Sequence, residues 1–300
     1  MGNVDFDLAE LDVTARWQLR PPRQFPAPWA CEWGFDEYGL WQAADIKGIK
    51  LCLRYIPPGQ FLMGSPKDET GRRDNETQHL VRLTSGFWLA ETTITQALWQ
   101  AVMGDNPSKF KGDNLPVENV NWLDSLEFCH RLNQQIKGFN LTLPSEAQWE
   151  YACRAGTSTP FNLGKTIDSE HVNFDGNYPY GQSEKGPYRQ QAVEVDSFAR
   201  NAWGLYQMHG NVREWCLDEF ENDISAYQQV PLVNGQQTPA WLEMQLTQGG
   251  KGAVNTRRVL RGGAWDSVAH YCRSAFRFRL DAVSRSSFIG LRVALVERSE

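Results

Sequence analysis

The residues of this chain most capable of chemistry are its cysteines and histidines. Closely spaced thiolates and imidazoles bind metals or act as nucleophiles, but the six cysteines and five histidines are scattered over 300 residues, with no C-x-x-C pair and no regular histidine spacing. The chain also lacks the G-x-S-x-G, P-loop, dinucleotide-binding and H-E-x-x-H signatures. The sequence therefore predicts no standard catalytic site, and we expect the cysteines to be buried, reduced thiols.

Ligand recognition is indicated instead by residues 266–289, which read DSVAHYCRSAFRFRLDAVSRSSFI. Aromatic rings beside small hydroxyls are the composition of adaptable recognition surfaces. The recurring arginines are expected to pair with acidic residues of the scaffold. We expect a protein or another macromolecular ligand at the following candidate residues: Trp265, Asp266, Ser267, His270, Tyr271, Phe276, Phe278, Leu280, Ser284, Ser286 and Phe288.

The same segment has an unusual composition. It contains no Lys, Glu, Gln, Met or Trp, although these five types are common in the rest of the chain. They are the types that an asparagine codon cannot reach when only its first two bases change. The composition is therefore what adenine-directed mutagenesis of asparagine codons would leave. An ordinary binding loop that lacks these residues is the alternative, and the sequence does not decide between the two.

Short strands and a few helices must position this segment. Strands are predicted where short apolar stretches alternate with Pro/Gly turns, at 51–56, 61–64, 79–83, 87–89, 258–261 and 291–295. Helices are predicted from Thr93 to Gly104, from Asn121 to about Leu132, and from a capping box at Ser145–Gln148 to Gly156. Little regular structure is predicted between Thr157 and Arg258. Together these patterns indicate a loop-rich α+β fold.

The N-terminal part differs in composition from the rest of the chain. Residues 1–45 contain a Pro-rich piece followed by Trp29, Trp33 and Trp41, which predicts an extended arm whose rings dock on a main domain, 46–300. The net charge of −6 argues against a nucleic-acid partner. Since no targeting or membrane-spanning segment is visible, we expect a cytoplasmic protein.

Six ordered phrases carry a family resemblance. They lie at 61–64 (FLMG), 91–96 (ETTITQ), 115–122 (LPVENVNW), 143–152 (LPSEAQWEYA), 203–215 (WGLYQMHGNVREW) and 258–265 (RVLRGGAW), and are closed by GLR at 290–292. Together they resemble the formylglycine-generating enzyme (sulfatase-modifying factor) family from about residue 50 onward. The resemblance implies that family's loop-rich variant of the C-type lectin fold. Within the family, the segment 266–289 is most similar in character to the variable proteins of diversity-generating retroelements.

The resemblance also implies residues for an oxidase. Enzymes of this family bind copper through two cysteines five positions apart, and the matched positions here are Ser267 and Cys272. A serine hydroxyl is a poor ligand for Cu(I), which prefers soft thiolates. The departure at Ser267 therefore weakens the enzyme hypothesis, and copper is not expected to bind.

A structural calcium ion is a further implication of the resemblance. The family's calcium ligands map to Gln207, Gly210, Val212 and Glu214, a set of oxygen donors that suits Ca²⁺. The alternative is that Glu214 pairs with a nearby arginine, and the sequence leaves both open.

Three functions remain compatible with the sequence. The leading hypothesis is a non-catalytic binding protein with a recognition surface, which could be hypervariable, at 266–289. The alternatives are a copper-dependent oxidase that acts on a sulfatase cysteine, and a degenerate family member that serves as a regulatory or assembly module.

Overall fold

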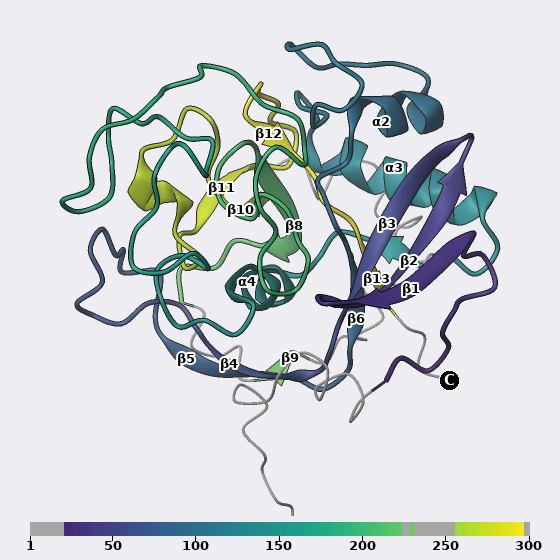
Figure 1. Cartoon of the computed structure of the whole chain (residues 1–300), viewed down its shortest axis with the longest axis horizontal. Helices are drawn as coiled ribbons and strands as arrows, with labels where there is room; N and C mark the ends of the chain where they lie inside the picture. The colour runs from purple at the N-terminus through teal and green to yellow at the C-terminus, as the bar shows by residue number, and fades with distance from the viewer. Residues whose placement is uncertain (1–20, 224–228, 231–255, 297–300) are drawn as a thin grey trace, which may run out of the picture.

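A six-stranded sheet forms one side of the molecule. The computed structural model describes residues 21–223, 229–230 and 256–296. Across this sheet the strands run in the order β1 (Glu32–Asp36), β2 (Gly39–Ile46), β3 (Ile49–Ile56), β6 (Phe87–Ala90), β13 (Ala294–Val296) and β7 (Leu141–Thr142). Every neighbouring pair is antiparallel. Because β13 lies between β6 and β7, the C-terminal part of the chain joins segments that are far apart in sequence (Figure 1).

Two smaller sheets complete the strand framework. One has the order β11 (Phe278–Asp281), β10 (Arg257–Arg261), β8 (Arg213–Glu219) and β12 (Ile289–Gly290), and the other consists of β4 (Gly59–Met63), β5 (His79–Leu83) and β9 (Gln229–Val230). The sequence patterns predict neither β8 nor β11. Strand β8 is buried over its first five residues, where Trp215, Cys216 and Leu217 pack in the apolar core and Glu214 pairs with Arg292.

The three predicted helices are present: α2 (Gln96–Met103), α3 (Trp122–Gln135) and α4 (Glu146–Arg154). Capping boxes begin α3 at Asn121 and α4 at Ser145. Helix α2 begins two residues later than predicted, because Thr95 and not Thr93 accepts the capping hydrogen bond, from the backbone N–H of Leu98. None of the helices in the described ranges combines the length and apolar character needed to cross a membrane.

The N-terminal segment differs from the predicted arm. Its Pro-rich part does dock through aromatic rings, since Phe25 stacks on Trp88 and Trp29 meets Phe139 edge-on. However, residues 32–46 form the β1–β2 hairpin, and β2 pairs with β3 along most of its length. The predicted boundary at residue 45 therefore falls inside a continuous sheet. Strands can form here because the chain contains no proline between Pro28 and β3.

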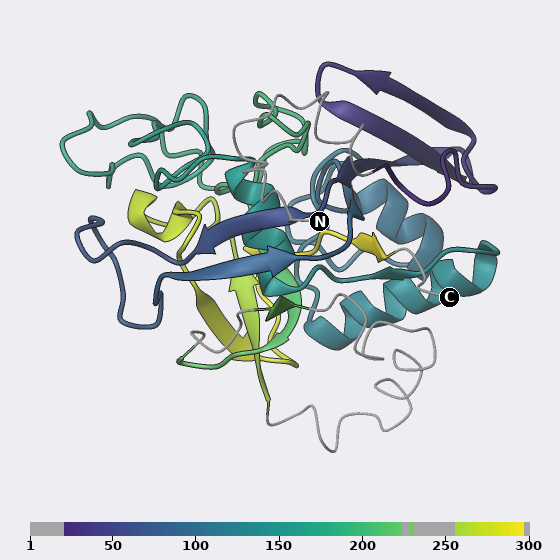
Figure 2. The same cartoon turned by 90° about the horizontal axis from the view of Figure 1, so that it is seen from below.

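Between α4 and β8 the described chain has no helix and no strand longer than an isolated bridge, as predicted for this part. In Figure 2 most of this loop segment lies to the left and the β1–β2 hairpin to the right, and the two meet where the guanidinium of Arg200 lies over the ring of Tyr38, in the turn between β1 and β2. A large apolar core containing Trp88, Trp122 and Trp215 brings together residues of the six-stranded sheet, α2, α3 and β8. A second cluster around Trp149 surrounds α4. The candidate segment 266–289 is thus attached to a rigid, densely packed body.

Candidate ligand-binding face

The segment from Trp265 to Phe288 connects β10 to β12 and crosses the surface on the side of the long loops (Figure 1). It contains the short 3₁₀ helix η1 (Ala269–Cys272) and the edge strand β11. It begins after a tight turn at Gly262 and Gly263, both with positive φ. A Cβ at Gly263 would lie 2.6 Å from Sγ of Cys272, so the turn requires glycine for space as well as for conformation.

Arginines anchor this segment from beneath. The guanidinium of Arg273 contacts the carboxylates of Glu69 and Glu76 at 2.5 and 2.8 Å, and Arg277 pairs with Glu146 at 2.6 Å. Near the surface, Arg285 pairs with Asp124. The predicted pairing of the segment's arginines with acidic scaffold residues is confirmed at these positions.

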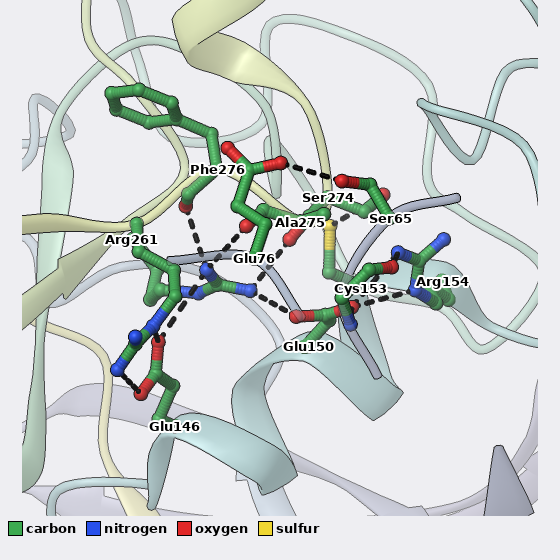
Figure 3. Close-up of polar contacts among 12 residues, drawn as sticks. Ser65, Glu76, Glu146, Glu150, Cys153, Arg154, Arg261, Ser274, Ala275 and Phe276 are labelled. Atoms are coloured by element: carbon green, nitrogen blue, oxygen red, sulfur yellow. Dashed lines mark hydrogen bonds and ion pairs between the residues drawn. The ribbon is translucent and has the colours of Figure 1, made fainter. Parts of the chain in front are cut away.

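A second buried network lies next to these anchors. Figure 3 shows the carboxylate of Glu150 between the guanidinium groups of Arg261 and Arg154, from which it is 2.5 and 2.8 Å away. Arg261 also donates to the backbone carbonyls of Ser274, Ala275 and Phe276. Because buried charges are tolerated only when they are paired and hydrogen-bonded, this network fixes the course of the backbone below the face.

The candidate ligand-binding residues divide into two groups. Ser267 and Phe276 have only 2% and 1% of their surface exposed, so the structure places these two inside the protein and not on the face. The others keep part of their surface exposed: Trp265, Asp266, His270, Tyr271, Phe278, Leu280, Ser284, Ser286 and Phe288. Phe276 is interior because Tyr271 stacks on it at 4.6 Å from the outer side.

Arg213 organises the centre of the face, and the sequence patterns do not single it out. Its Nη2 donates to Oγ of Ser267 at 2.8 Å, and its Nη1 lies 3.4 Å from Oδ1 of Asp266. The guanidinium also lies over the rings of Phe278 and Phe288, at 4.8 and 4.9 Å from their centroids. This buried cation thereby fixes two half-buried rings and one carboxylate relative to one another.

An aromatic rim from other segments extends the face. The ring of Trp265 is nearly parallel to that of Tyr188, 6.4 Å away, and meets Phe110 edge-on at 5.6 Å. Burial raises the pKa of Tyr188, and the charges of Asp175 and Asp266 raise it further. Four partly exposed side chains therefore bring rings and a carboxylate together: Trp265, Tyr188, Phe110 and Asp266.

The two positions matched to copper-binding cysteines do not fit a copper site. The hydroxyl of Ser267 already accepts hydrogen bonds from Arg213 and from the backbone N–H of Ala264. Burial raises the pKa of the Cys272 thiol to about 12, so it is protonated at neutral pH. In the described part of the chain, no three His, Cys, Asp or Glu side chains gather closely enough to hold a metal ion. One buried thiol cannot supply the pair of thiolates that Cu(I) requires.

A buried histidine lies next to Cys272. His209 accepts from the backbone N–H of Asn162 at Nε2, and its Nδ1 donates to the carbonyl of Cys272 at 2.7 Å. Burial lowers the pKa of His209 to about 4. Its neutral ring therefore links the loop at Asn162 to η1.

Of the predicted calcium residues, Gln207, Gly210 and Val212 lie at the turn before β8, and Glu214 is the second residue of β8. Both carboxylate oxygens of Glu214 accept hydrogen bonds from Arg292, and one also accepts from Nε1 of Trp149. Gln207 accepts from the side-chain amide of Asn211 and donates to the carbonyl of Glu194. Of the two alternatives for Glu214, the structure has the arginine pair. A cation bound by Gln207, Gly210, Val212 and Glu214 would share its carboxylate with a guanidinium.

Comparisons with known proteins place these features in a family context. The family model "Sulfatase-modifying factor enzyme 1-like domain" matches residues 53–296. "Chaperone protein LppX" of Paenibacillus barcinonensis is 27% identical over 256 residues, which cover 70% of this chain and 80% of that protein. The formylglycine-generating enzyme of Thermomonospora curvata is 30% identical over 201 residues, which cover 65% of this chain but only 57% of the enzyme.

A solved structure is similar over most of its length. "Treponema denticola variable protein 1" superimposes with a TM-score of 0.65 and 27% sequence identity. The match covers 85% of this chain and 98% of that protein.

Proposed function

The chain belongs to the sulfatase-modifying factor enzyme 1-like domain family, and from this premise we propose that it is a non-catalytic binding protein whose recognition face lies at 266–289. The predicted family and its α+β, C-type-lectin-like fold are confirmed. Membership alone does not decide the function, because one fold carries both enzymes and binding proteins.

The observation that carries this proposal is the state of Ser267. In an oxidase of this family the matched position would offer a thiolate to copper, whereas here a buried hydroxyl is bonded to Arg213 and to the backbone. The same guanidinium holds Phe278, Phe288 and Asp266 in a partly exposed cluster. Ser267, at the position matched to a copper-binding cysteine, thus helps to hold a partly exposed cluster that could contact a ligand.

The similarity to a variable protein supports a hypervariable face. That protein is 27% identical to this chain and superimposes with a TM-score of 0.65 over 85% of it. The absence of Lys, Glu, Gln, Met and Trp from 266–289, which mutagenesis of asparagine codons would leave, points in the same direction. In this proposal the face varies between copies of the gene and binds a protein or another macromolecule, while the buried arginines preserve the fold.

A regulatory or assembly module is the second candidate. The observation in its favour is the 27% identity to a relative named as a chaperone, 80% of which is covered. Like the leading proposal, this candidate has no catalytic activity. Unlike the leading proposal, it predicts that the sequence of residues 266–289 is constant.

Incubation with Cu(I), oxygen and a sulfatase-type Cys-x-Pro-x-Arg peptide tests the absence of catalysis. Mass spectrometry is expected to recover the peptide cysteine unchanged, and its conversion to an aldehyde would overturn the proposal. A companion variant, Ser267→Cys, should raise the affinity for Cu(I) in a competition titration with a chromogenic chelator, because it supplies a second soft ligand. Ser284→Cys, outside the matched pair, is the control and should leave the affinity unchanged.

A further inference from the structure

A cavity of about 250 Å³ opens beside β3, away from the proposed recognition face. Its walls come from strand β3, from the Glu91–Thr95 segment that leads into α2, and from the loop around Val195 and Arg200. No residue of 265–288 lines it. Ligand pockets for drug-sized molecules measure about 300–1,000 Å³, so this cavity suits a smaller molecule.

Three of the charged side chains in this cavity are already paired. Arg200 contacts Oε1 of Glu91 at 2.9 Å, and Arg54 contacts the same oxygen from behind at 3.2 Å. Lys50 lies 2.6 Å from Glu32 at the rim. Because these three charges are compensated within the protein, the carboxylate of Asp196 is the remaining charge among the side chains that line the cavity.

The start of helix α2 is not an anion site either. The backbone N–H groups of Gln96 and Ala97 donate to the carbonyls of Leu115 and Asp113, and that of Leu98 donates to Oγ1 of Thr95. An anion bound at a helix N-terminus needs N–H groups that point at it unoccupied. Here the first three are used within the fold.

The groups that remain open are neutral or accept hydrogen bonds. Among the described residues, none hydrogen-bonds to the hydroxyls of Thr92 and Thr93 or to Oδ1 of Asn114. Asp196 accepts from the amide of Asn114 through Oδ1 only, which leaves Oδ2 open. Ile94 and Leu98 lie behind these groups in the same wall, with only 1% and 3% of their surface exposed. A molecule with several hydroxyls would satisfy the open groups.

The walls are fixed before any ligand binds. Arg292 donates to the carbonyls of Ala90, Glu91 and Tyr206, which ties the end of β6 to the loop across the cavity. The backbone N–H of Tyr206 also donates to the carbonyl of Glu91. A preformed site loses little conformational entropy when it binds a small molecule.

We propose that this cavity binds a small neutral polyol of monosaccharide size. The hydroxyls of Thr92 and Thr93 exchange hydrogen bonds with the ligand, while Asn114 and Asp196 accept from its hydroxyls. This site is independent of the proposed recognition face.

Saturation-transfer NMR with D-glucose, D-mannose and D-galactose at millimolar concentration tests the proposal. At least one hexose should receive saturation from the protein, whereas L-glutamate and inorganic phosphate should not. Thr93→Val keeps the shape of the side chain and removes its hydroxyl. It should weaken hexose binding about fivefold to tenfold, since one hydrogen bond to a buried group is lost.

Thr84→Val, at an exposed position outside the cavity, is the matched control and should bind like the unmodified protein. Melting temperatures of both variants establish that they are folded. The proposal is overturned if no hexose receives saturation, if glutamate or phosphate binds in place of the hexoses, or if Thr93→Val binds as well as Thr84→Val.

Discussion

Nη2 of Arg213 lies 2.8 Å from Oγ of Ser267, and this hydrogen bond joins the first residue of β8 to the segment that follows β10. Both side chains are buried. The bond uses the one hydroxyl that stands where the family's oxidases are expected to have a thiolate. The same guanidinium lies over Phe278 and Phe288. Ser267 thereby has a structural role in this chain.

Removal of this hydroxyl should destabilise the fold. Ser267→Ala leaves a buried guanidinium N–H and the backbone N–H of Ala264 without their acceptor. We expect the free energy of unfolding to fall by about 1–3 kcal/mol, as measured by urea denaturation. Ser284→Ala is the control, since no described residue hydrogen-bonds to that hydroxyl, and it should change stability by less than about 0.5 kcal/mol. Equal effects of the two variants would contradict the assigned role of Ser267.

Local sequence patterns located both α3 and α4, and the capping box of α4 was predicted, whereas that of α3 is seen only in the structure. In each, the N-cap side chain accepts from the third helical residue and the N-cap backbone N–H donates to that residue's side chain in return. The β1–β2 hairpin was missed because its sequence follows directly on a Pro-rich piece, and its place is decided by pairing with β3. Long-range pairing of this kind has no local signal.

The candidate segment 266–289 was chosen for its composition, which does not indicate which of its side chains point into the protein and which stay exposed. Its arginines were correctly expected to pair with acidic residues, whereas the side-chain directions of Phe276 and Ser267 depend on contacts with Tyr271 and Arg213. Arg213 itself comes from a distant strand. The role of Arg213 depends on the register of β8 against β12, which a single sequence does not display.

The stacked rings of Tyr271 and Phe276 differ in burial, since Tyr271 is partly exposed and Phe276 is buried. Phe276→Ala should cost about 3–5 kcal/mol, the same range as Trp149→Ala or Trp215→Ala, because all three side chains are buried. Tyr271→Ala should cost about 1 kcal/mol, since its ring is partly exposed. Phe278→Ala and Phe288→Ala should lie between, because both rings pack on the core and on Arg213. Chemical denaturation of the six variants measures this order. A cost for Tyr271→Ala equal to that for Phe276→Ala would mean that the segment is core throughout.

His209 should make stability depend on pH. Burial lowers its folded-state pKa to about 4 from an ordinary value of 6.5. Between these values the unfolded chain binds a proton that the folded protein does not, so this contribution is complete above pH 6.5 and is lost as the pH falls toward 4. The difference corresponds to roughly 3 kcal/mol.

The variant His209→Gln isolates this effect. It should be less stable than the unmodified protein at pH 7, and the gap in unfolding free energy should shrink as the pH falls to 4. Burial also raises the pKa of Asp218 to about 6, which acts in the opposite direction, but both proteins contain this group and the comparison cancels it. A gap that stays constant from pH 7 to pH 4 would contradict the assignment.

The family resemblance implies calcium binding through Gln207, Gly210, Val212 and Glu214, whereas the structure pairs Glu214 with Arg292. Because Arg292 already occupies both carboxylate oxygens of Glu214, we expect the melting temperature to be the same in excess CaCl2 and in EDTA. A ligand that binds only the folded state raises the melting temperature in a saturable way. Such a rise with calcium, absent with magnesium, would contradict this expectation. It would show that calcium displaces the guanidinium of Arg292 from the carboxylate of Glu214 or shares that carboxylate with it.

Sequencing of the part of the gene that encodes residues 256–296, from many individual cells, tests the central claim most directly. If the face varies on a fixed scaffold, coding differences should concentrate in codons 266–288. They should spare the codons of Arg273 and Arg277, because each guanidinium holds buried carboxylates. Identical sequences in every cell, or differences spread evenly over the scaffold, would contradict the claim of a variable recognition face.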